Sequence, residues 1–148
     1  MFGTTYARKI KTSRYIGLDF GSRSIGVAVN EGKIAIGAGT IFRERENALR
    51  GVFRELELIY KKIEPVEIAL GYPLNMDGTE GEACKKTRNF KLELEARFGV
   101  PVILWDERLS TVAVLRHAPR RATKSAIDEA AAIYILQGYL DFVLLKNI

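Results

Sequence analysis

Three strand-like segments near the start of the chain lie so close together in sequence that they can pair in only one way. Residues 14–20 are mostly apolar, residues 24–29 alternate large apolar side chains with glycine or alanine, and residues 33–42 follow closely. The gaps between them, residues 21–22 and 30–32, hold the turn-forming types Gly, Ser and Asn. Because turns this short join only antiparallel neighbours, the segments predict an antiparallel meander.

The rest of the chain alternates patterns typical of helices and strands. Apolar residues at helical spacing predict helices over residues 46–63 and 79–98. Short apolar runs at residues 66–70 and 102–105 predict a fourth and a fifth strand. We therefore expect an α/β fold: a mixed five-stranded sheet in which two β-α crossovers extend the meander, with helices on both faces.

Further helices are predicted toward the C-terminus, over residues 111–117 and 126–145. Two of the predicted helices open with the spacing of a capping box, in which a Ser or Thr side chain and an acid three residues later bond to free backbone N–H groups. The pairs are Thr79 with Glu82 and Ser125 with Asp128.

Length and composition indicate an ordinary globular protein. The 148 residues suit one domain, which we assign to residues 14–148, after a basic N-terminal extension over residues 1–13. We see no apolar run long enough to span a membrane and no secretory signal, and we expect a cytoplasmic protein without a membrane partner. One cysteine, Cys84, excludes an internal disulfide, and with a single histidine, His117, it gives little basis for Cys-His chemistry.

The charge of the chain favours an anionic partner. The net charge is +5 and the isoelectric point is about 9.4. Cations gather in the segment before Asp128, as Arg116, Arg120, Arg121 and Lys124. Such a run is usually a solvated loop, and the alternative is that it holds a phosphate backbone.

Three acidic residues stand where carboxylates can gather. Asp19 closes the first predicted strand, Glu107 follows the fifth, and Asp128 opens the last helix. The carboxyl ends of parallel strands lie along one edge of a sheet, so we expect Asp19 and Glu107 to share that edge. A cluster of carboxylates most commonly holds a divalent metal for phosphate chemistry.

Each of these acids also has a purely structural interpretation. Asp19 would accept hydrogen bonds from the turn that begins at Gly21, and Glu107 would pair with the arginine that follows it. Asp128 would complete the capping box with Ser125, in a first helical turn that favours an acid. Asp19 is the hardest to explain without a cation, because a carboxylate in an apolar strand is costly to bury unpaired.

Motifs spread over almost the whole chain resemble the YqgF/RuvX family, whose members are described as Holliday-junction resolvases and as nucleases of pre-16S ribosomal RNA. The motifs are GLDFGS at residues 17–22, IGVAV at 25–29, GYPLNMDG at 71–78, DERLST at 106–111 and IDEAAA at 127–132. The segment between the last two is several residues shorter than is common in the family, which bears on substrate fit.

The resemblance implies a ribonuclease H-like fold and a metal-dependent endonuclease. Asp19, Glu107 and Asp128 would be the catalytic acids and the ligands of Mg²⁺ or Mn²⁺ during phosphodiester hydrolysis. The nucleic-acid backbone would contact cationic side chains, for which the candidates are Arg23, Arg108, Arg120, Arg121 and Lys124.

The resemblance favours 5′-end processing of pre-16S rRNA, and it leaves other functions open. A resolvase of four-way DNA junctions has the same expected site, and resolvases are commonly dimers because two symmetric cuts need two sites. A nucleic-acid-binding protein without catalysis is a third interpretation. A fourth is a nucleotide-binding module, because residues 18–22 also resemble the phosphate-binding turn of actin-like ATPases. The protein is expected to be a monomer or a homodimer.

Overall fold

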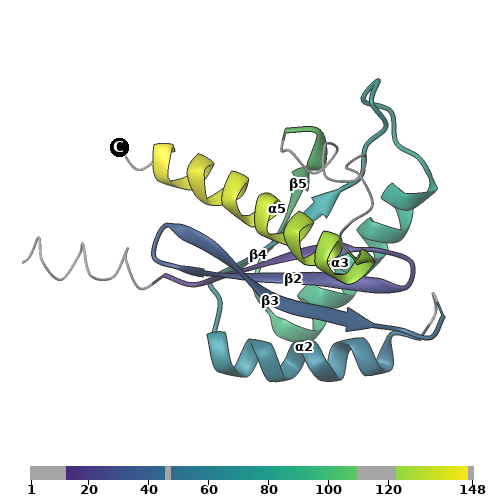
Figure 1. The fold of residues 1–148 in the computed structure, drawn as a ribbon, viewed down its shortest axis with the longest axis horizontal. Helices are drawn as coiled ribbons and strands as arrows, with labels where there is room; N and C mark the ends of the chain where they lie inside the picture. The colour runs from purple at the N-terminus through teal and green to yellow at the C-terminus, as the bar shows by residue number, and fades with distance from the viewer. Residues whose placement is uncertain (1–12, 46–47, 110–122, 147–148) are drawn as a thin grey trace, which may run out of the picture.

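The computed structural model describes residues 13–45, 48–109 and 123–146 (Figure 1). Its elements, in chain order, are β1 (Tyr15–Phe20), β2 (Ser24–Glu31), β3 (Ile34–Phe42), α2 (Arg50–Ile63), β4 (Glu67–Tyr72), α3 (Glu82–Phe98), β5 (Val102–Asp106), the short 3₁₀ helix η1 (Glu107–Leu109) and α5 (Lys124–Lys146). Residues 1–12 of the predicted extension (residues 1–13) and the helix predicted over residues 111–117 lie outside the described residues.

The five strands form one mixed sheet in the order β3-β2-β1-β4-β5. The pairs β1–β2 and β2–β3 are antiparallel, whereas β1–β4 and β4–β5 are parallel. Helix α5 crosses one face of the sheet and α2 and α3 cover the other (Figure 1). The predicted meander, the two crossovers and the helices on both faces are therefore confirmed.

The two faces of the central strands differ because their side chains alternate in size. Large apolar side chains of β1 and β2 point toward α2 and α3, in a cluster that includes Ile16, Leu18, Ile25, Val27, Phe53 and Phe90. The opposite face carries small residues, among them Gly17, Ala28 and Ala69. A Cβ atom at Gly17 would lie 2.6 Å from the Cβ of Leu136, so α5 packs almost directly on the backbone of β1.

Side chains of α5 also cover the outer edge of the sheet at β3. The backbone N–H of Gly39 donates to Glu129 Oε2 (2.6 Å), and that of Ala35 donates to Gln137 Oε1 (2.9 Å). Unpaired N–H groups of an edge strand otherwise invite pairing with another chain. The same bonds fix the position of α5 along the sheet.

Several predicted boundaries are wrong, for local reasons. Ala48 and Leu49 precede α2 rather than belonging to it, and Leu49 packs on the core from outside the helix. Strand β4 continues through Tyr72 rather than ending at residue 70, because Tyr72 still pairs with Asp106 of β5. Gly81 precedes α3, so no side chain of the N-cap residue caps this helix.

The predicted capping box of Thr79 and Glu82 is likewise wrong. The Thr79 hydroxyl donates to Asp77 Oδ1 (2.6 Å), and its backbone N–H donates to the same oxygen (3.0 Å). Thr79 therefore closes a turn in the loop before α3 instead of capping the helix.

Candidate active site

Asp19 lies on the α5 side of the sheet, at the carboxyl end of β1. It is only 3% exposed. Its antiparallel partner in β2 is Gly26. On the other side, Leu18 pairs with Leu70 of β4, so the residue of β4 nearest to Asp19 is Gly71. A buried carboxylate thus stands between two positions that carry no side chain.

The turn after β1 does not use Gly21 to satisfy Asp19. The Gly21 N–H donates to the carbonyl oxygen of Ser24 (2.9 Å), which closes the turn between β1 and β2. The structural interpretation of Asp19 as the acceptor of the Gly21 N–H is therefore wrong.

Gly26 brings the start of α5 onto the sheet beside Asp19. A Cβ atom at Gly26 would lie 1.9 Å from the carbonyl oxygen of Asp128, far inside van der Waals contact. Only glycine permits this approach of helix backbone to strand backbone. Asp128 is consequently held next to the strand pair that carries Asp19.

The Asp128 carboxylate points to the sheet, where the hydroxyl of Ser24 donates to its Oδ2 in a short hydrogen bond. Asp128 is 8% exposed and Ser24 is 2% exposed. Helix α5 begins at Lys124, and the N–H of Ala126 donates to Thr123 Oγ1 (3.1 Å), so Thr123 caps the helix. The predicted capping box of Ser125 and Asp128 is wrong, and the Asp128 side chain instead accepts a hydrogen bond from Ser24 of the sheet.

Glu107 is the first residue of η1, directly after β5. Its side chain lies over β4, because a Cβ atom at Gly71 would be 2.7 Å from Glu107 Oε1. The same Cβ atom would be 2.5 Å from Cδ1 of Ile135 in α5, so Glu107 lies on the α5 side of the sheet. The missing side chain of Gly71 gives Glu107 the space beside Asp19.

The three acids thus converge on one end of the sheet from three separate elements, as the sequence predicts for Asp19 and Glu107. Their carboxylate oxygens suit a hard divalent cation. Asp19 and Asp128 are buried, and Glu107 is half-buried. In the described residues, however, no three His, Cys, Asp or Glu side chains are gathered tightly enough to hold a metal ion. The positions of the three residues in the fold and their carboxylate oxygens fit a divalent metal. The Asp128 carboxylate is bonded to Ser24 instead of being gathered with the other two acids.

Arg108 is tied to the protein at the same end of the sheet. Its Nη2 donates to Asp106 Oδ2 (2.9 Å), and its Nη1 donates to the carbonyl oxygen of Met76 (3.3 Å). The hydrogen bonds from Arg108 lower the pKa of Asp106, and the same side-chain hydrogen bonding raises the pKa of the Arg108 guanidinium. Arg108 therefore links the loop after β4 to the end of β5.

A second network anchors that loop at its far end. The Tyr72 hydroxyl donates to Glu80 Oε1 (2.5 Å), and Arg88 Nη1 donates to Glu80 Oε2 (2.8 Å). Burial is the main cause that raises the pKa of the Tyr72 hydroxyl, and the hydrogen bond from Tyr72 lowers the pKa of Glu80. The loop beside Glu107 is thus held in its middle at Met76 and near its far end at Glu80.

The other predicted nucleic-acid contacts are less constrained. Arg23 is exposed in the turn between β1 and β2, and Lys124 is exposed at the first position of α5. Arg120 and Arg121 lie outside the described residues.

Comparison with known proteins identifies the family. The family model described as "RuvX: Holliday junction resolvase" matches residues 13–142. The chain belongs to the RuvX family. A RuvX relative from Agathobacter rectalis, named "Putative pre-16S rRNA nuclease", is 44% identical over 137 residues, which cover 88% of this chain and 96% of the relative. A relative of the same name from Desulfitobacterium hafniense is 43% identical over 141 residues, or 90% of this chain and 96% of the relative.

Solved structures extend the likeness of this RuvX chain to the fold. T. thermophilus RuvC in complex with a Holliday junction substrate matches with a TM-score of 0.59 at 14% identity, covering 89% of this chain and 96% of RuvC. The yeast mitochondrial Holliday junction resolvase Ydc2 matches with a TM-score of 0.55 at 13% identity, covering 97% and 87%. The expected ribonuclease H-like fold is confirmed.

Three residues of this RuvX site were missed from sequence. Gly26 lies inside a predicted strand, where an isolated glycine is a known sign of close backbone approach. Gly71 lies inside β4 but beyond the predicted end of that strand at residue 70, so the same sign did not point to it. Ser24 carries no such local sign, because its bond to Asp128 joins residues 104 positions apart.

No helix in the described part of the chain is long and apolar enough to cross a membrane.

Proposed function

We propose that this protein is a metal-dependent endonuclease that hydrolyses phosphodiester bonds in structured nucleic acid. The observation that carries the proposal is the convergence of Asp19, Glu107 and Asp128 on one end of the sheet, around the two glycines that flank Asp19. Membership in the RuvX family supports the same chemistry.

Asp19, Glu107 and Asp128 would hold the metal, Mg²⁺ or Mn²⁺, which when bound activates water and stabilises the leaving oxygen. Asp19 contributes a charge at a position that is almost fully buried, where electrostatic attraction is less screened. Ser24 orients the Asp128 carboxylate, and Gly71 leaves the Glu107 carboxylate its place over β4.

We propose structured RNA as the substrate, in the 5′-end processing of pre-16S rRNA, and a cytoplasmic location where that RNA is made. Support comes from relatives above 40% identity that carry the name "Putative pre-16S rRNA nuclease". The net charge of +5 suits a polyanionic substrate. Arg23 and Lys124, exposed beside the acids, are the described candidates for phosphate contacts.

A four-way DNA junction is the second candidate substrate, because the family description names Holliday junction resolvase activity. This function would require a homodimer, since two symmetric cuts need two active sites. The RNA function is compatible with a monomer.

One assay separates these candidates. Purified protein is incubated with a pre-16S rRNA fragment and with a four-way DNA junction, each with Mg²⁺, with Mn²⁺ and with a chelator. The proposal predicts metal-dependent cleavage of the RNA and little cleavage of the junction. Faster cutting of the junction would favour the resolvase, and binding of nucleic acid without cleavage under any condition would indicate a non-catalytic binding protein.

A further inference from the structure

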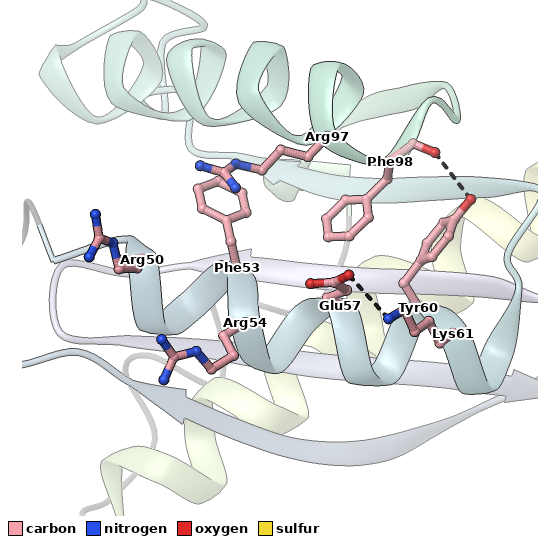
Figure 2. Close-up of a pocket in the computed structure, with 8 residues that line it drawn as sticks. All are labelled: Arg50, Phe53, Arg54, Glu57, Tyr60, Lys61, Arg97 and Phe98. Atoms are coloured by element: carbon pink, nitrogen blue, oxygen red, sulfur yellow. Dashed lines mark hydrogen bonds and ion pairs between the residues drawn. The ribbon is translucent and has the colours of Figure 1, made fainter.

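A cleft lies between α2 and α3 (Figure 2). These helices cover the face of the sheet opposite to α5 and the three acids. Its volume is about 420 Å³. Tyr60 and Phe98 lie together at one end, where the Tyr60 hydroxyl donates to the Phe98 carbonyl oxygen (3.1 Å) and their rings stack at 4.8 Å. Arginine side chains lie around the other end (Figure 2).

The lining of this cleft is strongly cationic. Arg50 and Arg54 come from α2, and Arg97 comes from the last turn of α3. The acid of the cleft, Glu57, is paired with Lys61 (3.3 Å). Among the described residues, none of the three arginines forms an ion pair. The cleft therefore has a positive charge that the described protein does not balance.

Stability of α2 does not explain the arginines there. Arg50 and Arg54 are four residues apart, so like charges face each other on one side of the helix. Arg50 is also the first residue of the helix, where the backbone dipole disfavours cations, and the first turn contains no acid. An arrangement that costs helix stability is accounted for if the charges bind an anion.

One of the guanidinium groups is already held in place. Arg97 lies over the ring of Phe53, with its Cζ 4.3 Å from the ring centroid, and Phe53 is only 4% exposed. Stacking of this kind orients the planar guanidinium and reduces the entropy that it loses on binding a phosphate.

A second cleft has lining residues that are sequence neighbours of residues in the first cleft and of Asp19. It is lined by Leu49, the neighbour of Arg50, and by Phe20, the neighbour of Asp19. Arg43 and Lys86 also line it, and the Arg43 guanidinium lies 4.6 Å from the centroid of the Phe20 ring. Arg43 is buried and donates to the Gly21 carbonyl oxygen, and Glu93 also lines this cleft, so Lys86 is its exposed cation. Cations in two separate clefts suit a chain of phosphates better than a single small anion.

We infer that the arginine cleft, meaning Arg50, Arg54 and Arg97, binds the phosphodiester backbone of a single-stranded segment that flanks the cleavage site. The segment leaves the three acids, passes the turn after β1 and the second cleft, and reaches the face covered by α2 and α3. This inference rests on the proposed nuclease function, since it assigns a second contact for the same nucleic-acid substrate.

The test measures binding without cleavage, by fluorescence anisotropy of labelled RNA in the presence of a chelator. The cleft variant is Arg50→Gln/Arg54→Gln/Arg97→Gln. The control variant, Arg14→Gln/Lys33→Gln/Lys62→Gln, removes the same charge outside the cleft. Two RNA lengths are compared, about 6 and about 20 nucleotides, because only the longer one can occupy both the acid end and the cleft. A double variant, Arg50→Gln/Arg54→Gln, leaves the Arg97–Phe53 contact intact in case the triple variant folds poorly.

For the long RNA, the cleft variant should bind at least about tenfold more weakly than the control variant. The slope of log K against log salt should fall by about two, as expected when three contacts to a single strand are lost. For the short RNA, the cleft and control variants should bind alike. Equal binding of the long RNA by the cleft and control variants would overturn the inference. An equal loss of affinity for both RNA lengths would also overturn it. In either case, cleavage by the wild type would leave the nuclease proposal intact. Failure of the wild type to bind any nucleic acid would overturn both.

Discussion

The carboxylate of Asp128 is held by a hydroxyl from the other end of the chain. Ser24 opens β2, and its bond to Asp128 Oδ2 turns that side chain from the helix terminus toward the sheet. Both residues are buried, so the carboxylate depends on protein donors rather than on water. At the scale of single residues, this bond is what separates a candidate metal ligand from a helix cap.

Removal of the Ser24 hydroxyl should therefore destabilise the metal-free protein. A hydrogen bond to a charged group contributes more than a neutral one, and we expect Ser24→Ala to lower the free energy of unfolding by about 1–3 kcal/mol. Urea denaturation in the presence of a chelator measures this. Ser22→Ala, at an exposed position of the adjacent turn, is the control and should change stability by less than about 0.5 kcal/mol. Equal effects of the two substitutions would show that the bond does not stabilise Asp128.

Asp106 and Arg108 should give a specific pH dependence of stability. Arg108 lowers the pKa of Asp106 in the folded protein, so the pair stabilises the fold above the unfolded pKa of about 3.9. That stability is lost as the pH falls through the lower folded pKa. Arg108→Gln should thus be less stable than wild type near pH 6, and the difference should shrink below about pH 4. Thermal melts across this range test it, with Arg23→Gln as control, and a difference that stays constant with pH would contradict the assignment.

At the scale of elements, the site depends on how closely α5 approaches the sheet. Gly26 lets the backbone at Asp128 lie on β2, whereas Gly71 accommodates the ends of two side chains, Glu107 and Ile135. Backbone cannot move aside, but side-chain ends can. The two glycines should therefore respond differently to the same substitution.

Gly26→Ala should damage the fold. Its methyl group would overlap the Asp128 carbonyl oxygen, and we expect a loss of about 3 kcal/mol or more in the free energy of unfolding. Gly51→Ala is a matched control in α2, where an added Cβ meets nothing within 4 Å, and should raise stability by about 0.5–1 kcal/mol. Near-wild-type stability of Gly26→Ala would contradict the close packing of α5 on β2.

Gly71→Ala should impair catalysis more than folding. The methyl group would displace the Glu107 carboxylate, which lies 2.7 Å from its position, and a small misplacement of a catalytic group lowers rates strongly. We expect cleavage to fall at least about tenfold while the variant remains folded by circular dichroism. Gly51→Ala should again cleave like wild type. Unchanged cleavage by Gly71→Ala would argue against a role for Glu107.

The elements themselves were largely predictable, because each has a strong apolar period. The predicted boundaries were wrong where polar hydrogen bonds or strand pairing set the end of an element. Thr79 bonds to Asp77 instead of capping α3, and Tyr72 extends β4 by pairing with β5. The three acids were predicted as site residues from the family motifs together with the rule on strand ends. The bond from Ser24 to Asp128 could not be predicted, since it depends on how α5 docks on the sheet.

At the scale of the whole molecule, the sheet separates two surfaces of opposite character. The acids and α5 lie on one face, and the arginine cleft lies between α2 and α3 on the other. Phe20 follows Asp19 in β1 and lines the second cleft, which also contains Leu49, the neighbour of Arg50. One short strand end therefore links the proposed cleavage centre to the proposed binding path.

The most direct test of the central claim is the rate of RNA cleavage by Asp19→Asn with Mg²⁺ or Mn²⁺. This substitution keeps the size of the side chain and removes the buried charge that would bind the ion. Asp141→Asn is the control, because Asp141 is an exposed residue of α5 that accepts a hydrogen bond from Gln137 (3.0 Å). We predict that Asp19→Asn folds and has no cleavage above background, while Asp141→Asn cleaves like wild type. Cleavage by Asp19→Asn at the wild-type rate would contradict the account.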